Sequence, residues 1–95
     1  MTRPQATATQ LADTPRTRVT RFDFAPGAET GWHTHGMDYV ITAITDCTML
    51  LEEPGGTSRT VMVPAGTAYT RDAGVEHNVI NGGEAPMSFV EVELK

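Results

Sequence analysis

The segment from residue 27 to residue 39 reads GAETGWHTHGMDY and holds two of the three histidines in the chain. His33 and His35 are two residues apart in a run typical of a β-strand, and side chains at i and i+2 lie on the same face of a strand. Two imidazoles on one face can share a cation. The third histidine, His77, lies in a second strand-like run, residues 76–81. We therefore expect the fold to bring His77 opposite the other two, giving a metal site with three nitrogen ligands.

The rest of the chain consists of short β-type segments separated by turn residues such as Pro-Gly, Gly-Gly and Asp-Ala-Gly. No part of it has a convincing helical periodicity, and the segments recur about every 8–12 residues. This spacing predicts an all-β sandwich or barrel. We expect strands at residues 18–24, 32–35, 39–44, 48–52, 59–63, 68–71, 77–81 and 87–94.

The first sixteen residues, MTRPQATATQLADTPR, contain almost nothing large and apolar. Such a composition cannot drive its own packing. We predict that residues 1–16 form a flexible N-terminal arm and that residues 17–95 form one barrel domain. The alternative is an arm that pairs with a neighbouring subunit.

Size and charge limit the classes of function. A chain of 95 residues forms one domain with a thin stability margin, which a metal or a partner subunit would widen. Twelve acidic and seven basic residues give a net charge of −5 without any Lys/Arg cluster, so we expect no nucleic-acid partner. The apolar runs are too short to span a bilayer, and no secretory signal is seen. We expect a cytoplasmic protein without a membrane partner.

Cys47 is the single cysteine. It excludes an intramolecular disulfide and fits a reducing compartment. A lone cysteine can be a nucleophile or a metal ligand, but free cysteines are generally buried. We predict a buried, inert thiol.

The histidines also lie in a known pattern, because the chain resembles a small single-domain cupin, an antiparallel β-barrel of jelly-roll type. The first cupin motif has a glycine, five residues, His-x-His, a glutamate three or four residues later and then a late glycine. Here Gly27 precedes His33-Thr34-His35, Tyr39 stands in place of the glutamate, and Asp46 stands in place of the late glycine.

The second cupin motif runs from a glycine through a Pro-x-Gly turn to a histidine and an asparagine. In this chain it comprises Gly66, Asp72-Ala73-Gly74, His77 and Asn81, with Asp72 in place of the proline. The resemblance covers residues 17–94. It implies a jelly-roll barrel with a metal held inside by His33, His35 and His77, and a homodimer, because small cupins commonly pair.

Tyr39 in place of a carboxylate changes the expected chemistry. Counting by twos from His35 places Tyr39 inside the barrel and Asp38 outside. Three neutral imidazoles cancel none of the charge of a cation, so the cation polarises a bound oxygen ligand more strongly and favours anions. The expected cofactor is a divalent transition metal ion: zinc, iron, nickel, copper or manganese.

Tyr39 has two interpretations. Its phenol can act as a fourth ligand or a general base near a dication, or it can be a barrel-lining aromatic whose hydroxyl finds a hydrogen bond. Among weaker candidates, Arg71 could pair with a carboxylate substrate or lie solvated on the surface. Glu91 and Glu93 alternate with valines, which is typical of a half-buried strand and not of a catalytic carboxylate pair. We expect Trp32 to point outward and Asn81 to satisfy backbone groups at a turn. Glu29 and Glu76, which flank the motifs, are weaker candidates for a supporting role beside the site.

Two classes of function fit these residues. The first is a metal-dependent enzyme acting on a small oxygen-bearing molecule, with Tyr39 as the candidate catalytic residue. It could be a dioxygenase for a diketone-like or enol-like substrate, or an isomerase or lyase that stabilises an enolate. The second is a non-catalytic module that binds or senses a metal or a small molecule. A purely structural dimerisation domain is a third option, against which the three histidines count.

Overall fold

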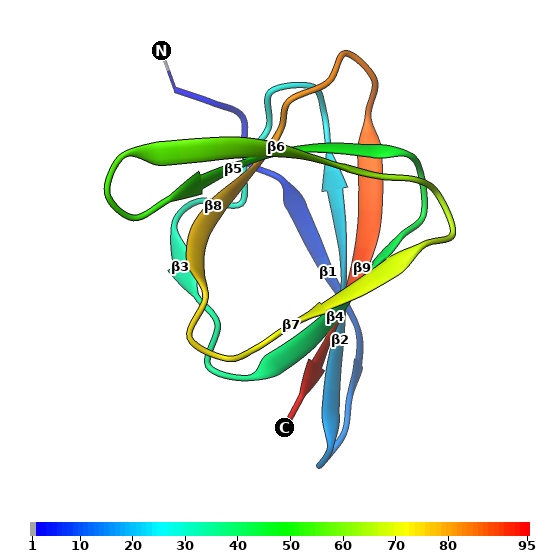
Figure 1. Ribbon diagram of the computed structural model, residues 1–95. Helices are drawn as coiled ribbons and strands as arrows, with labels where there is room; N and C mark the ends of the chain where they lie inside the picture. The colour runs from blue at the N-terminus through cyan, green and yellow to red at the C-terminus, as the bar shows by residue number, and fades with distance from the viewer. Residues whose placement is uncertain (1) are drawn as a thin grey trace.

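The computed structural model describes residues 2–95, and these residues form nine strands and no helix (Figure 1). No helix that could cross a membrane is therefore found among them. The strands are β1 (Thr7–Asp13), β2 (Thr17–Phe24), β3 (His33–Thr34), β4 (Asp38–Ala43), β5 (Cys47–Glu53), β6 (Thr57–Val63), β7 (Ala68–Arg71), β8 (Glu76–Asn81) and β9 (Met87–Leu94). Each segment expected as a strand overlaps one of these strands, so the all-β prediction is confirmed.

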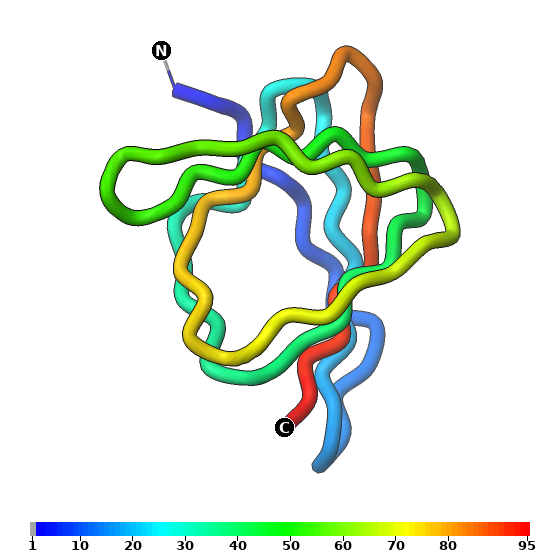
Figure 2. Tube along the Cα trace, viewed as in Figure 1, coloured from blue at the N-terminus to red at the C-terminus, as the bar shows by residue number. Residues whose placement is uncertain are grey.

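The strands form two antiparallel sheets that wrap around a common interior (Figure 2). One sheet has the order β1-β2-β9-β4-β7, and the other has the order β3-β8-β5-β6. Neighbours in a sheet are mostly distant in the sequence, as in β2 beside β9 and β5 beside β8. This double-stranded arrangement confirms the predicted jelly-roll barrel.

Three phenylalanines form one apolar wall of the interior. Phe22 and Phe89 are register partners on β2 and β9, with ring centroids 5.5 Å apart. Phe24 lies 5.4 Å from Phe89 and is almost fully buried. Aromatic pairs at such separations add stability beyond their buried area. The wall keeps β2 and β9 in register and limits the cavity described below.

The prediction of a flexible arm at residues 1–16 needs correction, because residues 7–13 form strand β1. This strand pairs antiparallel with β2, from Thr7 opposite Asp23 to Asp13 opposite Arg18. All seven of its residues are exposed. A strand that buries no side chain is held by backbone hydrogen bonds and needs no alternating apolar pattern, so no periodicity in residues 7–13 indicates it. Pairing with a neighbouring subunit stays a prediction.

Candidate metal centre

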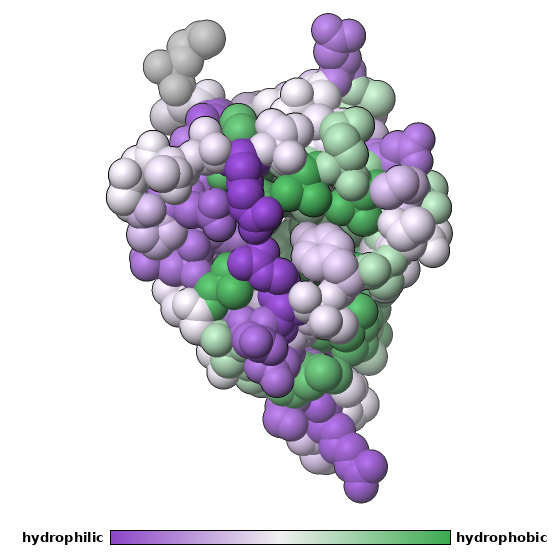
Figure 3. All heavy atoms as spheres, viewed as in Figure 1, coloured by the Kyte–Doolittle hydropathy of each residue, from purple (hydrophilic) through white to green (hydrophobic). Residues whose placement is uncertain are grey.

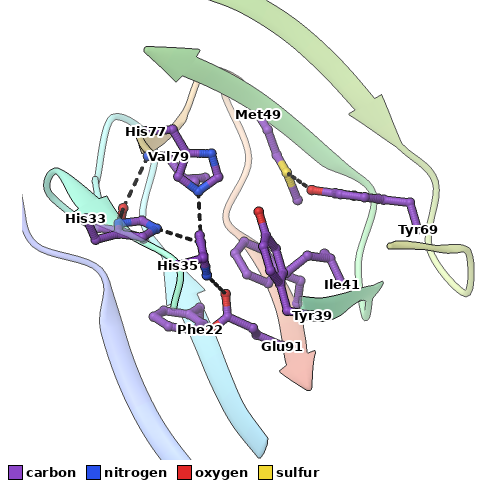
Figure 4. A pocket seen from close by; sticks show the side chains of 12 residues that line it. Phe22, His33, His35, Tyr39, Ile41, Met49, Tyr69, His77, Val79 and Glu91 are labelled. Carbon is purple, nitrogen blue, oxygen red and sulfur yellow. Dashed lines mark hydrogen bonds and ion pairs between the residues drawn. The ribbon is translucent and has the colours of Figure 1, made fainter. Parts of the chain in front are cut away.

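The three histidines are brought together by one short pair of strands. β3 contains only His33 and Thr34, and it pairs antiparallel with β8 so that His33 is the register partner of His77. His35 follows β3 directly, where its backbone N–H donates to the Val75 carbonyl at 2.8 Å. The local backbone pairing therefore directs all three imidazoles toward one another, as Figure 4 shows.

The ring nitrogens converge as the sequence predicts. His35 Nε2 lies 3.0 Å from His33 Nε2 and 3.1 Å from His77 Nε2. One nitrogen from each residue can be chosen so that all three lie within 4.8 Å of one another. His35 and His77 are buried, and His33 is half-buried. The expected juxtaposition of His77 with the other two is confirmed.

Hydrogen bonds among the imidazoles alone would leave this cluster unsatisfied. His33 Nδ1 lies 2.8 Å from the Gly31 carbonyl, which can only accept, so Nδ1 carries a proton. His33 Nε2 then offers a lone pair. His35 Nε2 carries either one proton or one lone pair. It therefore cannot form a hydrogen bond with both neighbouring rings. A cation shared by the three lone pairs satisfies all of them.

The spacing of the nitrogens fits such a cation. Two nitrogens that each lie about 2.1 Å from one ion are about 3.0 Å apart at an angle of about 90°, and about 3.4 Å apart at the tetrahedral angle. The separations of His35 Nε2 from the other two nitrogens, 3.0 and 3.1 Å, match the first value, and all three ligand atoms lie within 4.8 Å of one another. The three histidines are thus positioned to bind a metal ion.

The environment of the imidazoles keeps their lone pairs available. Burial, followed by the charge of His33, lowers the pKa of His35 to about 4 and that of His77 to about 3. Both rings are therefore neutral at neutral pH. A neutral imidazole is the form that ligates a metal.

Tyr39 packs directly on the histidine cluster. Its ring stacks on His35 with centroids 3.8 Å apart and an interplanar angle of 16°. The side chain is 2% exposed, and its hydroxyl has no hydrogen-bond partner among residues 2–95. Burial raises the pKa of Tyr39 to about 12. The phenol is therefore a neutral donor directed into the interior, which favours neither the phenolate ligand nor the general base.

Asp38 lies outside the site, as the alternation of side chains predicts. It is exposed, and its Oδ1 accepts a hydrogen bond from the Ala73 N–H at 2.8 Å. The strand is not bulged between Asp38 and Tyr39, since both follow the regular register with β9. Asp38 thus stabilises the β7–β8 turn and is not directed toward the histidines.

The histidines and Tyr39 lie in a cavity of about 220 Å³. Its other lining residues are mostly apolar: Phe22, Thr30, Ile41, Met49, Tyr69, Val79, Phe89 and Glu91. Pockets for drug-sized ligands measure about 300–1,000 Å³. The cavity thus suits a ligand of a few heavy atoms with one polar end.

A family model described as the cupin domain matches residues 20–93. The chain is a cupin. It is 54% identical over 93 residues to the β-alanine degradation protein BauB of Pseudomonas aeruginosa, covering 98% of this chain and 97% of that protein.

Two solved structures have a fold similar to that of this cupin over almost all of its length. A cupin domain from Bordetella pertussis Tohama I has a TM-score of 0.95 at 49% identity, covering 100% of this chain and 98% of that chain. The polyketide cyclase RemF from Streptomyces resistomycificus has a TM-score of 0.73 at 28% identity, covering 99% of this chain and 70% of that chain.

Glu91 is a site residue of this cupin that the sequence interpretation missed. The alternation in β9 was read as a half-buried strand, but Glu91 faces the cavity and is 9% exposed. Its Oε1 lies 3.9 Å from His35 Nδ1, so one acidic group does stand beside the histidines, on the side away from their converging nitrogens. Burial, then the charge of Glu93, raises the pKa of Glu91 to about 7. Met87 and Phe89 are buried and stand at alternate positions before Glu91 in β9. These two apolar residues indicate which face of the strand points inward.

Asn78 is the second residue that was missed. It is 1% exposed, and its Oδ1 accepts from the Gly31 N–H at 3.0 Å. Its Nδ2 donates to Glu29 Oε1 at 2.8 Å and to Glu52 Oε1 at 2.9 Å. Because the Gly31 carbonyl holds His33, the Asn78 amide positions a candidate metal ligand through the backbone of Gly31. Of the two glutamates that flank the motifs, Glu29 takes part in this arrangement.

The remaining expectations concern packing. Cys47 is buried and its Sγ donates to the Ser88 carbonyl at 3.5 Å, so the predicted burial of the thiol is confirmed. Asn81 bonds the carbonyls of Phe24 and Ala85, in agreement with its predicted turn role. Trp32 is 55% exposed and faces away from the cavity lining. Glu76 is exposed on β8 and contributes nothing to the cavity.

The buried titratable groups predict how the stability of the metal-free protein depends on pH. Between pH 5 and 6 the unfolded chain protonates His35 and His77, whereas the folded chain does not; Glu91 does the reverse. Unfolding thus takes up two protons and releases one, a net uptake of one, so stability rises with pH by about 1.4 kcal/mol per pH unit. Urea unfolding at pH 5 and pH 6 with a chelator measures this slope.

The variant Glu91→Gln removes the one proton that unfolding releases. The net uptake then becomes two protons, so we expect the slope of stability against pH to about double. An unchanged slope in Glu91→Gln, or a metal-free protein more stable at pH 5 than at pH 6, would contradict the assigned charge states.

Proposed function

We propose that this cupin is a metal-dependent enzyme that acts on a small oxygen-bearing molecule at His33, His35 and His77. The observation that supports it best is the convergence of three Nε2 atoms at a cavity that also holds an unpartnered, buried hydroxyl. A buried hydroxyl without a partner is unfavourable, and a ligand oxygen in the cavity would satisfy it. Tyr39 is the proposed catalytic residue.

The proposed substrate class is a short 1,3-dicarbonyl compound or its enol. A metal dication in the site supplies Lewis acidity toward a carbonyl oxygen and, if it is redox-active, activation of dioxygen. The Tyr39 phenol, neutral because burial raises its pKa to about 12, donates a hydrogen bond or a proton to the oxygen that gains negative charge. The apolar walls exclude water from an enolate. Two similar proteins act on small oxygen-bearing molecules by name: one is a β-alanine degradation protein and the other a polyketide cyclase.

The nitrogen separations also bear on the metal. Two of the three separations, 3.0 and 3.1 Å, would correspond to angles of about 90° at an ion about 2.1 Å from each nitrogen, and such angles suit octahedral coordination more than the mostly tetrahedral sites of zinc. We therefore favour ferrous iron, manganese or nickel over zinc. Elemental analysis of protein purified without added metal tests this preference, and a stoichiometric zinc content would reverse it.

Turnover of acetylacetone with and without oxygen tests the enzyme. Protein loaded with iron, manganese or nickel is incubated with the diketone, and the products are identified by mass spectrometry. Cleavage that needs oxygen supports the dioxygenase version, and oxygen-independent conversion supports the isomerase or lyase version. Absence of any turnover of acetylacetone or of a short 3-oxo acid, with stoichiometric metal bound, argues against an enzyme of this class.

Replacing Tyr39 by phenylalanine separates catalysis from stability. The change removes a buried hydroxyl that has no partner and keeps the ring on His35, so we expect Tyr39→Phe to be as stable as the wild type or more stable by about 1 kcal/mol. Turnover should fall about 10²- to 10⁴-fold, the range for loss of a general acid. Thermal unfolding and kcat measure the two effects. Retained turnover would show that Tyr39 only lines the barrel.

The second candidate is a non-catalytic module that binds or senses a metal or a small molecule. Tyr39 in place of the motif carboxylate favours it, because the site then lacks a strong base directed at the ligand. Metal below about a tenth of an equivalent per chain, without thermal stabilisation by added metal, would remove the basis of the enzyme proposal. The homodimer, the cytoplasmic location and the lack of nucleic-acid or membrane partners stay predictions from the sequence.

A further inference from the structure

We propose that Arg71, assisted by Arg59, forms an anion subsite at the mouth of the metal cavity and binds the carboxylate of the substrate. The inference rests on the proposed function, because it narrows the substrate class from any small dicarbonyl to a short oxo acid. It goes beyond the histidine site by assigning a role to a second hollow in the barrel.

Strand register places Arg71 next to the histidine cluster. On β4 and β7, Tyr39 is directly opposite Arg71, and Ile41 is directly opposite Tyr69. Directly opposed residues share a face of the sheet and have Cβ atoms about 5 Å apart. Tyr39 stacks on His35, so Arg71 stands on the inner face one strand away from a proposed ligand.

Arg59 approaches the same opening from the other sheet. It is the register partner of Leu51 on β5, and Leu51 is in turn the partner of Val79 on β8. These three residues therefore share the inner face of their sheet, and Val79 lines the metal cavity. The two arginines thus face one opening from opposite sheets.

A hollow of about 270 Å³ lies between these residues and is lined by Leu51, Arg59, Val61, Tyr69 and Arg71. Tyr69 also lines the metal cavity, so the two spaces adjoin at its ring. In Figure 3 hydrophilic side chains gather in the middle of this face, between β6 and β7, beside a hollow. A ligand can therefore reach from the arginines toward the histidines.

Arg71 and Arg16 are the two cations without an ion pair within residues 2–95, and of the two only Arg71 is half-buried. Arg3, Arg18, Arg21, Arg59 and Lys95 each form an ion pair with a carboxylate. Within residues 2–95, no carboxylate lies within ion-pair distance of Arg71, although its side chain is half-buried and the net charge is −5. Arg59 uses its Nε for Glu53 at 3.2 Å, which leaves its terminal nitrogens free. The subsite therefore holds one uncompensated guanidinium and part of a second.

The charge of Arg71 reaches the interior. Burial is the main cause of the raised pKa of Tyr39, and the positive charge of Arg71 opposes it. A guanidinium fork matches a carboxylate through two parallel hydrogen bonds. A molecule with a carboxylate at one end and a carbonyl two carbons away could satisfy Arg71 and direct its carbonyl oxygen toward Tyr39 and the histidines. A neutral diketone would leave the arginine without a partner.

Binding of malonate and acetylacetone tests the subsite, because the two probes share a 1,3-dicarbonyl frame but only malonate carries carboxylates. Isothermal titration calorimetry is done on metal-loaded and on chelator-treated protein. We expect Arg71→Gln to raise the Kd of malonate about 10- to 100-fold and to leave that of acetylacetone within about twofold. Arg71→Lys should fall between, because it keeps the charge and loses the fork. Arg16→Gln is the matched control, since Arg16 is exposed in the β1–β2 turn and its loss changes the net charge equally.

The outcomes separate this proposal from the proposed function. Arg71-dependent malonate binding supports the subsite even in a protein that shows no turnover. Equal malonate affinity in the wild type and Arg71→Gln overturns it, as does an equal loss for both probes or an equal loss in Arg16→Gln. Malonate that does not bind the wild type with stoichiometric metal also overturns it.

Discussion

Replacing His77 by alanine is expected to lower the affinity for a divalent metal by two to three orders of magnitude. About 10–16 kcal/mol of binding in a four-ligand site corresponds to about 2.5–4 kcal/mol for each ligand. His77 Nε2 lies 3.1 Å from His35 Nε2, and no other histidine in the chain can replace it. Elemental analysis after dialysis, together with competition against a chromophoric chelator, measures the loss. Circular dichroism verifies that the barrel still forms.

The matched control is Asp38→Asn, which alters the carboxylate nearest to Tyr39 in sequence. Its Oδ1 accepts a hydrogen bond from the Ala73 N–H, and its side chain is exposed. We expect metal content to change by less than a factor of two. An equal loss of metal in both variants would mean that Asp38 is a ligand and that β4 is bulged in solution. The variant His77→Gln guards against misfolding, because it keeps a polar side chain of similar size.

Replacing Asn78 by alanine is expected to cost about 3 kcal/mol of unfolding free energy and to weaken metal binding about 10- to 100-fold. The amide forms three hydrogen bonds of 3.0 Å or less, two of them to carboxylates. Hydrogen bonds to charged groups contribute about 1.5–3 kcal/mol each, and partial exposure of the two glutamates reduces that value. Without the amide, Gly31 loses its anchor and the carbonyl that orients His33 is free to move. Urea unfolding and metal titration measure the two effects.

Glu76→Ala is the control on the same strand, because Glu76 is exposed and lies outside the cavity. It should change neither quantity by more than about 0.5 kcal/mol. If Asn78→Ala lost stability but kept full metal affinity, Asn78 would be purely structural. If it changed neither, the hydrogen bonds to Glu29 and Glu52 would not persist in solution.

Much of the barrel and of its site could be predicted from local pattern. Turn residues at short intervals mark the strand ends, and the period of two places Tyr39 inside and Asp38 outside. The same rule did not reveal the site residue of β9. Glu91 and Glu93 alternate with valines, as is typical of a half-buried strand, but Glu91 faces the cavity. It also gave no sign of β1, because an exposed strand held by backbone hydrogen bonds needs no apolar side chains.

The sequence by itself determined that this chain forms a β-barrel and that His33 and His35 share a face, because both follow from the alternation of side chains along a strand. Only the tertiary structure decided which residues meet across strands. The register of β3 with β8 sets His77 against His33, and the register of β4 with β7 sets Arg71 beside Tyr39. Pairing between distant strands depends on how the whole chain closes into a barrel, and no local periodicity encodes that.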